Sequence, residues 1–527
     1  MHAALQLHEA GRLDEANALY TRALACEPEN IDALHFSGVV AFQQGRHEVA
    51  EALIAQALAR NAINPAAHSN LGNVLVARGR PAEAEASYRR AIALQPEYVE
   101  ACVNLGSMLT RQDRRDEAAA CYESALAAAP GSAKLHFHFA ALQVDRAGPQ
   151  QAIAGFHRAL ELKPDYAEAW NGLAIALLAL ARVDEAEGAY RQALRLKPDF
   201  GQATFGYGLL KLMQGDYATG WPLYESRLDR KVLDEPVYAR VHDRLDELHD
   251  VPRWAGAEPP GRILLAWTDQ GLGDALMCLR YLPLLKKRGF ARLVVQCDAS
   301  LVPLVESIQG VDKVVAQESP PPFGEFDCHC PMSSLPYAFA TRLDTIPATV
   351  PYLRVPGAAK EQWAQRLADL RSPRVGVVWA GRRDFPKDAL RSIRLEQFSA
   401  LFEVEGVAFV SLQKGGEPLR QTGATLAVHD WMDQSGSLLD TAALIEQLDL
   451  VVAVDTGIVH LAGALGRPVW LLNRFESEWR WMLERADCPW YPTMRIFRQD
   501  RRGDWSGVLQ RVAGALSELA RTRSAGA

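Results

Sequence analysis

Long apolar runs are absent from this chain of 527 residues. None approaches the roughly 20 consecutive apolar residues that a helix needs to cross a lipid bilayer. The first residues, MHAALQLHEAGRLDEA, also lack the basic start and apolar core of a secretory signal peptide. We therefore expect a cytoplasmic protein with no integral membrane segment.

The chain also lacks an excess of positive charge. The chain has 57 Lys and Arg residues against 64 Asp and Glu residues, which gives a formal net charge of −7. A nucleic-acid partner requires a basic surface to meet its phosphates, so we expect no nucleic acid to bind. Hydrophobic residues make up 49% of the chain, which is enough for several large cores.

Clustered cysteine is the third absence. Of the eight cysteines, only Cys328 and Cys330, on either side of His329, lie close together in the sequence. No second pair occurs at a spacing typical of zinc sites, so we interpret this triplet as a strand edge and expect no metal. Unpaired thiols are typical of a reducing compartment, in agreement with a cytoplasmic location.

A period of 34 residues runs through the first half of the chain. One position holds a large, mostly aromatic side chain: Tyr20, Ile54, Tyr88, Tyr122, Phe156, Tyr190 and Tyr224. Another position holds a small residue: Gly38, Gly72, Gly106, Ala140, Ala174 and Gly208. Small residues let two helices cross closely, the large residue fills the space beside the crossing, and recurring prolines end the second helix.

This pattern resembles the tetratricopeptide repeat, whose helix pairs stack into a superhelix with a concave inner face. We expect such an α-solenoid over residues 1–234, with about seven units. The first unit is truncated. The last unit, residues 201–234, is degenerate, and we expect it to dock onto the second half of the chain.

The concave face of such an array commonly binds peptides. Asn70 and Asn104 occupy equivalent positions on first helices, where their amides could hydrogen-bond an extended chain. A similar asparagine ladder occurs in the repeat domain of nucleocytoplasmic O-GlcNAc transferases. Polar solvation of the groove is the alternative, because Phe36, His138 and Gly172 stand at the same register. The hypothesis is that Asn70 and Asn104 line an acceptor groove.

From Gly261 onward the pattern changes to strands that alternate with helices. Apolar strands are predicted at 262–267, 293–296, from 374 and at 409–416, with helices at 275–287 and near 506–521. Proline-rich loops are predicted at 319–326 and 330–336. Such alternation builds parallel sheets. We therefore expect two Rossmann-like domains facing a cleft, at 261–357 and 358–527, after a linker at 235–260.

The stretch LDLVVAVDTGIVHLAGALGRPVWLL is the strongest indication of function. It reads as a strand at Leu450–Val454, a turn at Asp455-Thr456-Gly457, a helix stopped by Gly466 and a second strand at 468–472. The turn lies where the carboxyl end of a strand meets the amino end of a helix. Free backbone N–H groups and the helix dipole attract an anion there, which indicates a phosphate-bearing ligand.

The loop before the first predicted helix of the second half carries GLGDAL at 271–276. It is a poor dinucleotide fingerprint, because Leu276 replaces the third glycine, so NAD is disfavoured. The glycines still let a ligand approach the backbone closely, which makes Gln270, Gly271 and Gly273 candidate binding residues. Asp274 is either the N-cap of the helix or a general base facing the cleft.

Further polar groups come after strands of the last domain. Trp379 and Gly381 lead into a basic stretch with Lys387, Arg391 and Ser392, whose cations could neutralise a diphosphate. A solvated surface loop is the alternative. Another strand ends in Gln413 and Lys414, and Glu417 lies just beyond, where a ribose hydroxyl could bind. The aromatic residues Trp479, Trp481, Trp490 and Tyr491 could stack on a ligand, although a packed core is the favoured interpretation.

At these residues the second half resembles the glycosyltransferases of family 9, the heptosyltransferase-like group with the GT-B fold. The motif D-T-G-x-x-H-x-A-x-A-x-G at 455–466 carries the resemblance, together with GLGD. Bacterial repeat-containing glycosyltransferases share further motifs, which stand here as WAG (379–381), RSI (391–393), SLQKG (411–415), DTAALI (440–445) and PWYPTMRIFRQ (489–499). The resemblance covers nearly the whole chain.

The resemblance implies roles for individual residues. Asp274 corresponds to the base, Thr456 and Gly457 hold the diphosphate, Asp455 bonds the donor sugar and His460 orients the turn. The first α/β domain is then the acceptor side and the second the nucleotide-sugar side. The chain has RSIR at 391–394 where heptosyltransferases have K-x-W-P, which argues against ADP-heptose and leaves UDP-sugars open.

The sequence thus predicts an inverting, metal-independent glycosyltransferase that needs no cofactor beyond its nucleotide-sugar donor. Its repeats recruit a protein acceptor or partner. Transfer to a lipid-linked or polysaccharide acceptor is one alternative. A non-catalytic scaffold, in which the repeats bind partners and the α/β half is structural, is the other.

Overall fold

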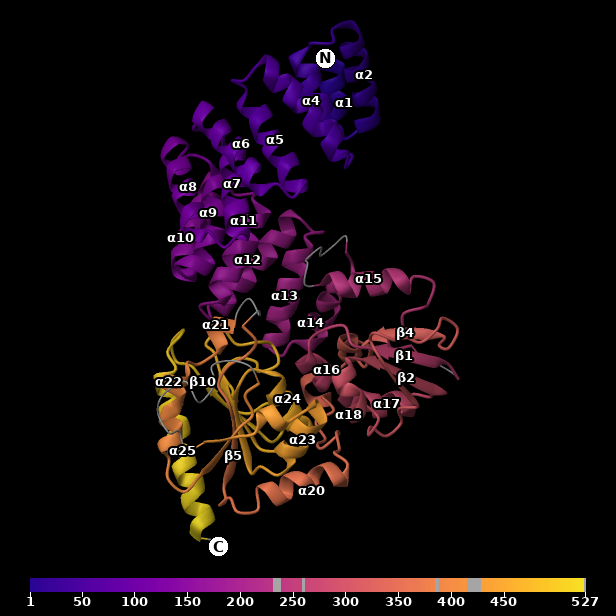
Figure 1. Cartoon of the computed structure of the whole chain (residues 1–527), viewed down its shortest axis with the longest axis vertical. Coiled ribbons are helices and arrows are strands. Elements are labelled where there is room, and N and C mark those ends of the chain that lie inside the picture. Colours follow the sequence, from indigo (N-terminus) through magenta and orange to yellow (C-terminus); the bar gives the residue numbers. More distant parts are fainter. Residues whose placement is uncertain (231–237, 258–260, 384–387, 415–427, 526–527) are drawn as a thin grey trace. The chain divides into compact units, whose positions relative to one another are not determined.

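The chain forms two compact units, residues 1–198 and residues 199–527 (Figure 1). The computed structural model describes residues 1–230, 238–257, 261–383, 388–414 and 428–525. The first unit consists of helices alone, and the second unit contains two parallel sheets. The expected α-solenoid followed by α/β domains is therefore confirmed. In the described ranges no helix combines the length and apolarity needed to span a bilayer.

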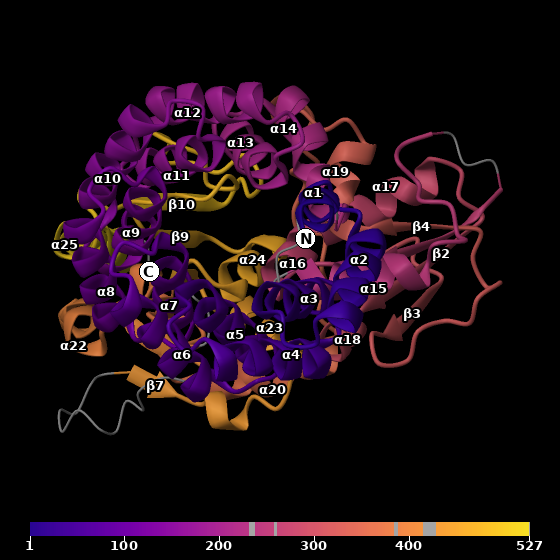
Figure 2. The ribbon, with the colours of Figure 1, turned by 90° about the horizontal axis from the view of Figure 1, so that it is seen from above.

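The first unit is a series of antiparallel helix pairs that succeed one another along an arc (Figure 2). Each pair comes from one 34-residue period of the sequence. The helices are α1 (His2–Glu9), α2 (Leu13–Cys26), α3 (Ile31–Gln43), α4 (His47–Arg60), α5 (Pro65–Ala77), α6 (Pro81–Leu94), α7 (Val99–Arg111), α8 (Arg115–Ala128), α9 (Ala133–Arg146), α10 (Pro149–Leu162), α11 (Ala167–Leu178) and α12 (Val183–Leu196).

Close helix crossings explain why the small and large positions recur. A Cβ atom on Gly72 of α5 would lie 2.5 Å from the ring of Tyr88 on α6. A Cβ on Gly38 of α3 would lie 2.6 Å from the side chain of Ile54 on α4. Tyr88 and Ile54 are buried, so neither can yield space. The glycines are required because the large side chain of the partner helix occupies the position of a Cβ.

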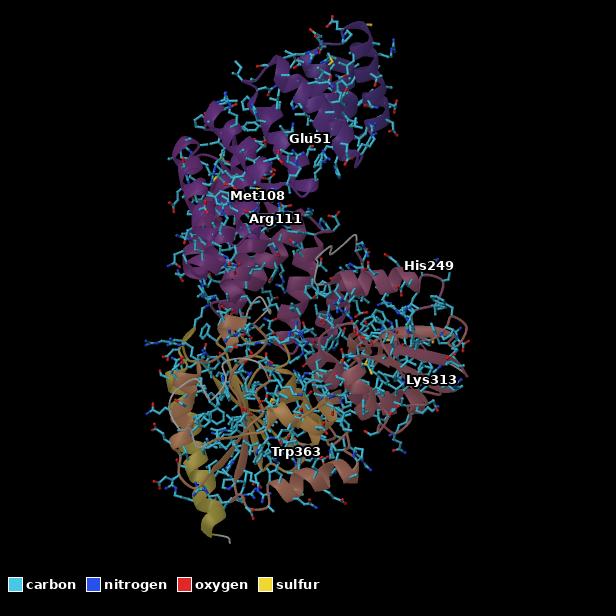
Figure 3. The ribbon with its side chains drawn as sticks, viewed as in Figure 1. Glu51, Met108, Arg111, His249, Lys313 and Trp363 are labelled. Carbon is cyan, nitrogen blue, oxygen red and sulfur yellow. The ribbon has the colours of Figure 1, made fainter. Side chains whose placement is uncertain are left out.

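Ion pairs join neighbouring repeats on the outside of the array. Glu51 on α4, labelled in Figure 3, is one such residue. It accepts hydrogen bonds from Arg80, which precedes α6, at 2.8 and 2.9 Å. Arg114, which precedes α8, contacts Glu85 of the previous repeat at 2.6 Å. Because such partly exposed pairs contribute little each, the packing of the buried face accounts for most of the stability.

A seventh helix pair begins the second unit. It contacts the α/β part of this unit, for example through a hydrogen bond from Trp221 Nε1 to the carbonyl oxygen of Thr341, at 3.0 Å. A further helix, α15, packs on the sheet through Val241 and Leu248. These elements are α13 (Gly201–Met213), α14 (Tyr217–Tyr224), η1 (Glu225–Leu228) and α15 (Ala239–Glu247).

The first α/β region, called here the first lobe, is built on a four-stranded parallel sheet of order β3-β2-β1-β4. Its strands are β1 (Ile263–Trp267), β2 (Arg292–Cys297), β3 (Lys313–Ala316) and β4 (Cys328–Pro331). Its helices are α16 (Leu272–Cys278), η3 (Leu279–Tyr281), α17 (Leu282–Lys287), η4 (Ala299–Leu301), α18 (Val302–Val305), η5 (Met332–Ser334), α19 (Leu335–Ala338) and η6 (Leu343–Thr345).

The second lobe is built on a six-stranded parallel sheet of order β10-β9-β8-β5-β6-β7. Its strands are β5 (Arg374–Val378), β6 (Ala408–Ser411), β7 (Val428–Asp430), β8 (Leu450–Val454), β9 (Val469–Asn473) and β10 (Met494–Arg498). Its helices are α20 (Gly357–Arg366), α21 (Asp388–Arg391), α22 (Leu395–Phe398), η7 (Ser399–Glu403), η9 (Met432–Gln434), α23 (Leu438–Glu446), α24 (Gly457–Ala464) and α25 (Ser506–Ala525).

Several elements differ from the sequence-based prediction. The strand expected at 409–416 ends at Ser411, and the linker expected at 235–260 contains helix α15, which packs on the first sheet. The helix expected at 275–287 is divided into α16, η3 and α17, and Pro283 in the first turn of α17 explains the division because it cannot donate a helical hydrogen bond. The loop expected at 330–336 contains the end of β4 followed by η5 and α19. Leu335 and Ser334 are buried there, so this segment belongs to the core of the lobe.

Candidate active site

The turn at Asp455-Thr456-Gly457 lies at the carboxyl end of β8, a strand whose five residues are all buried. The Asp455 carbonyl oxygen accepts a hydrogen bond from Arg391 Nη1 at 2.9 Å. Thr456 is the N-cap of α24, but its side chain makes no capping bond, and its Oγ1 is buried without a partner among the described residues. The amino end of α24 is thus left uncapped by Thr456, which suits it to bind an anion.

The side chain of Gln413, two residues after β6, forms hydrogen bonds with the backbone just after β5. Gln413 Oε1 accepts hydrogen bonds from the backbone N–H groups of Trp379 and Ala380, at 3.2 and 3.0 Å, and Gln413 Nε2 donates to the Ala380 carbonyl at 3.0 Å. The Trp379 side chain is buried in the core of the second lobe, beside Phe398. Only the backbone of Trp379 therefore lies at the carboxyl edge of the sheet.

Arg391 and Ser392 are fixed by Asp388, a buried carboxylate on α21. Arg391 Nε donates to Asp388 Oδ1 at 2.9 Å, and Ser392 Oγ donates to Asp388 Oδ2 at 2.8 Å. Ser392 Oγ also accepts from the Gly381 N–H at 2.9 Å, and a Cβ on Gly381 would overlap Arg391 and Asp388. The structure thus brings together four of the predicted donor-site residues, Gly381, Arg391, Ser392 and Gln413, around the Asp455 turn.

The remaining predicted residues of these loops do not join this group. Lys414 is exposed at the end of the described segment. Lys387 and Glu417 lie outside the described residues.

The loop between β1 and α16 packs directly on α24 of the second lobe. Gly271 is the N-cap of α16, so Asp274 lies within the first turn of the helix and is not the N-cap. A Cβ on Gly273 would lie 2.7 Å from the ring of His460, and a Cβ on Gly457 would lie 3.3 Å from Leu272. Gly273 of GLGD and Gly457 therefore permit close contact between the two lobes at the predicted site.

Asp274 forms an ion pair with Arg480, which comes from the second lobe. Arg480 Nη1 also contacts Glu478 Oε2 at 2.8 Å, and Arg474 Nη2 contacts Glu478 Oε1 at 3.3 Å. Arg474 comes directly after β9, the neighbour of β8, at the carboxyl edge of the sheet. The sequence-based prediction did not include Arg474, Arg480 or Asp388. For Arg474 and Arg480, the available signal was that both follow the strand predicted at 468–472.

Several buried polar atoms around this point lack hydrogen-bond partners within the described residues. They are Arg474 Nη1, Arg480 Nε and Thr456 Oγ1. Arg474 and Arg480 are 7% and 8% exposed. Buried donors without partners are costly in a folded protein and are commonly satisfied by a ligand or by water. The donors are guanidinium N–H groups and a hydroxyl, which is the chemistry that binds phosphate oxygens.

His460 is buried on α24 and serves the packing of the site. Its Nδ1 lies 3.0 Å from the hydroxyl of Tyr491, and its ring packs against Trp481 with 5.1 Å between ring centroids. Burial lowers the pKa of His460 to about 4, although the nearby Asp455 opposes this shift. The imidazole is therefore neutral near pH 7, which suits the predicted role of orienting the turn.

The aromatic residues after β9 form a packed core, as the favoured interpretation predicted. Trp479, Trp481, Trp490 and Tyr491 are all buried. Arg280 of the first lobe joins this core, because its guanidinium group lies over the rings of Trp490 and Tyr491 and donates to Tyr352 Oη at 3.1 Å.

In the first unit, the amides of Asn70 and Asn104 bond to the preceding repeat. Asn70 Nδ2 lies 2.9 Å from His35 Nε2, and Asn104 Nδ2 donates to Asn73 Oδ1 at 2.9 Å. Both asparagines are half-buried. Each asparagine therefore links the first helices of two neighbouring repeats. Among the described residues of the whole chain, no three His, Cys, Asp or Glu side chains gather in a way that could hold a metal ion.

Comparison with known proteins finds repeats and a transferase segment in this chain. Two models of the tetratricopeptide repeat match residues 7–73 and 41–87, and residues 69–133, 139–199 and 173–226. The model described as glycosyltransferase family 9 (heptosyltransferase) matches residues 436–501, which include the Asp455 turn, Arg474 and Arg480. The chain thus matches tetratricopeptide repeats in its first half and, over residues 436–501, a part of the family 9 glycosyltransferase model.

Protein FlbA of Caulobacter vibrioides is 29% identical over 348 residues, which cover 60% of this chain and 55% of FlbA. The chain therefore spans about half the length of this curated relative. Among solved structures, the Cut9–Hcn1 hetero-tetramer of the APC/C is similar with a TM-score of 0.39 and 19% identity, over 46% of this chain and 47% of that one. A tetratricopeptide repeat protein of Parabacteroides merdae is similar with a TM-score of 0.38 and 17% identity, over 47% of this chain and 96% of that one.

Proposed function

We propose that this chain transfers a sugar from a nucleotide-sugar donor to an acceptor hydroxyl. The observation that carries the proposal is the uncapped amino end of α24, against which the loop bearing Asp274 packs. An anion site and a carboxylate from facing lobes are the two components that this transfer needs. The family 9 match over residues 436–501 supports the same class of reaction.

The donor diphosphate is proposed to bind at Thr456 and Gly457. The first N–H groups of α24 and the partial positive charge of its amino end would meet the phosphate oxygens. Arg474 and Arg480 add buried cations with unpartnered N–H groups beside this point. Asp455 is proposed to bond the sugar, while Gly381, Arg391, Ser392 and Gln413 keep the neighbouring loops in place.

The proposed reaction is a single displacement with inversion. The acceptor oxygen attacks the anomeric carbon, and Asp274 accepts the proton of the acceptor hydroxyl. The bond between the anomeric carbon and the phosphate oxygen breaks, and the nucleoside diphosphate leaves with the electron pair. The ion pair with Arg480 holds the Asp274 side chain in place. Backbone dipoles and arginines would stabilise the leaving charge, so the proposal includes no metal.

The repeats are proposed to recruit a protein or peptide acceptor. Tetratricopeptide arrays commonly bind other proteins through their inner face. Asn70 and Asn104 remain the candidate groove residues. Because both also bond to the preceding repeat, an alanine variant must be checked for folding before a loss of acceptor modification is attributed to binding.

The first experiment is calorimetry of the full chain with UDP-, GDP-, ADP- and CMP-sugars. We expect one donor class to bind, and Asp455→Ala to weaken it by about 10-fold, the loss of one or two hydrogen bonds to a sugar. Asp433→Ala, an exposed residue on η9 of the same lobe, is the matched control and should bind like the wild type. Equal binding by Asp455→Ala would refute its assignment to the donor.

Failure of every nucleotide sugar to bind would favour the scaffold interpretation. If a donor binds and no protein acceptor is modified, a lipid-linked or polysaccharide acceptor becomes the candidate to test.

A further inference from the structure

Arg227 is a charged residue with no exposed side-chain surface, and it lies far in sequence from the predicted site. It belongs to η1, which comes directly after the seventh helix pair. The sequence-based prediction placed that pair at the degenerate end of the repeats and gave Arg227 no role. A buried guanidinium is expensive unless protein acceptors surround it, so its partners indicate what it does.

The partners of Arg227 are two loops at the carboxyl edge of the first lobe. Arg227 Nη2 donates to Asp269 Oδ2 at 3.2 Å, to Ser333 Oγ at 2.8 Å and to Ser334 Oγ at 2.9 Å. Asp269 lies in the loop after β1, and Ser333 and Ser334 lie just after β4. Asp269 Oδ1 also accepts from the Ser333 N–H at 2.9 Å. One guanidinium group therefore joins both loops.

Carboxylates balance the buried charge. Arg227 Nη1 donates to Glu225 Oε1 at 2.6 Å, and Glu225 is also paired with Arg253 at 2.7 Å. Burial by itself lowers the pKa of Arg227, but Glu225 and Asp269 outweigh burial and raise the pKa above its ordinary value. The side chain of Asp269 is only 1% exposed. The cluster is thus a buried network whose members depend on one another.

The loop held by Arg227 is the one that carries the proposed base. Only four residues separate Asp269 from Asp274. Between them lie Gln270, Gly271, Leu272 and Gly273, of which Leu272 and Gly273 contact α24 of the second lobe. A glycine-containing loop has little conformational preference of its own, so its course depends on the anchors at its ends. Trp267 fixes one end within β1, and Asp269 is the anchor nearest the site.

The helix pair that leads to Arg227 contacts both lobes. Trp221 on α14 donates to the Thr341 carbonyl of the first lobe at 3.0 Å. Tyr217 on α14 accepts a hydrogen bond from Trp490 Nε1 of the second lobe at 3.1 Å. The ring centroids of Trp221 and Trp479 are 5.2 Å apart. This pair is therefore part of the α/β unit rather than a free end of the array.

We propose that Arg227 is a positioning residue, which acts through Asp269 to hold the loop at 268–274 and so to place Asp274. The seventh helix pair is then a component of the transferase itself. This inference rests on the proposed role of Asp274. It goes further because it assigns a function to a residue outside both lobes.

The test compares hydrogen exchange of the full-length wild type with that of Arg227→Met and Arg227→Lys. We expect Arg227→Met to speed exchange of amides in residues 268–274 and 331–335 by about 10-fold or more, because a local anchor is lost. Exchange in β8 and α24 should be unchanged. Arg227→Lys keeps the charge but lacks the two-nitrogen guanidinium group that donates to several acceptors at once, so we expect an intermediate increase in the exchange rate. Arg230→Met is the matched control, since Arg230 lies two residues beyond η1 with its side chain 46% exposed.

Activity provides the second readout. With whichever nucleotide sugar binds, Arg227→Met should lower kcat by about 10-fold or more, while donor affinity stays within about 3-fold, because positioning affects the reacting geometry more than binding. Unchanged exchange at 268–274 in both Arg227 variants would overturn the inference. Faster exchange throughout the second unit in both variants would also overturn it, since Arg227 would then only support folding. The exchange data need no donor, so they stand even if the proposed transferase function fails.

Discussion

At the scale of single residues, the predicted site depends on close packing between the two lobes and on an ion pair that joins them. Gly273 has its position because the ring of His460 occupies the volume of a Cβ. Asp274 faces a cation that comes from 206 residues away in sequence.

Gly273→Ala is expected to destabilise the second unit by about 1–3 kcal/mol, the usual cost of overpacking a buried contact. His460 is 4% exposed and bonded to Tyr491, so it cannot move away from a new methyl group. Thermal unfolding followed by tryptophan fluorescence measures the change. Gly514→Ala on α25 is the control, because open space surrounds that position, and it should be neutral or slightly stabilising. A Gly273→Ala protein as stable as the wild type would contradict the close contact.

Asp274→Asn is expected to lower the transfer rate by about 10²- to 10⁴-fold, the typical contribution of a general base. Donor affinity should change little, since the amide keeps the shape of the side chain. Steady-state kinetics and calorimetry separate the two effects. Asp344→Asn, an exposed residue of the same lobe, provides the control. Full transfer by Asp274→Asn would show that another group takes the proton.

His460 makes stability depend on pH. Its pKa of about 4 in the folded protein lies below the ordinary value of 6.5. The unfolded chain therefore binds more protons between these values, and the free energy of unfolding falls as the pH drops from 6.5 to 4. For this histidine we expect a loss of about 2 kcal/mol between pH 7 and pH 5.

Denaturant unfolding at several pH values tests this expectation. His460→Gln should flatten the decline below pH 6.5, whereas the exposed His249→Gln should leave it unchanged. Because His329 has a similar pKa of about 4 in the same unit, part of the decline should remain in His460→Gln. Identical pH dependence in His460→Gln and the wild type would contradict the burial of a neutral imidazole.

At the scale of elements, the repeats show how one local rule produces many similar contacts. In each of several pairs, a glycine on the first helix faces a large side chain on the second. Sequence periodicity predicted this arrangement because each pair is local in the chain. The bonds of Asn70 and Asn104 to the preceding repeat were not predicted, because they join residues 35 and 31 positions apart.

Gly72→Ala is expected to destabilise the first unit by about 1–3 kcal/mol, since Tyr88 lies where the methyl group would stand. Circular dichroism during heating measures the helical transition. Gly188→Ala on α12 has open space around the new Cβ and should stabilise its helix slightly. If both variants behave alike, close crossing is not what selects glycine at this position.

At the scale of the whole molecule, the boundary between compact units does not coincide with the end of the repeat pattern. Residues 199–230 continue the 34-residue period, yet they lie in the unit that contains both lobes. Contacts of Tyr217, Trp221 and Arg227 with both lobes give the physical reason. The seventh helix pair thus belongs to the unit that contains the two lobes.

The proposed transfer reaction as a whole is expected to be insensitive to chelators. The leaving charge is assigned to the amino end of α24 and to arginines, so EDTA should leave the transfer rate unchanged. Steady-state rates with EDTA, with added Mg²⁺ and with neither compare these conditions directly. A loss in EDTA that Mg²⁺ restores would require a metal in the mechanism.

The sequence alone determined the repeat array, the parallel α/β lobes, strand β8 and the position of the turn at Asp455. Each of these arises from local periodicity or from a short motif, and such patterns reflect backbone geometry over a few turns. Only the tertiary structure decided that His460 packs on Gly273, that Arg480 meets Asp274 and that Arg227 holds Asp269. Those contacts join residues 42 to 206 positions apart and rest on the packing of whole elements, which no local pattern in the chain records.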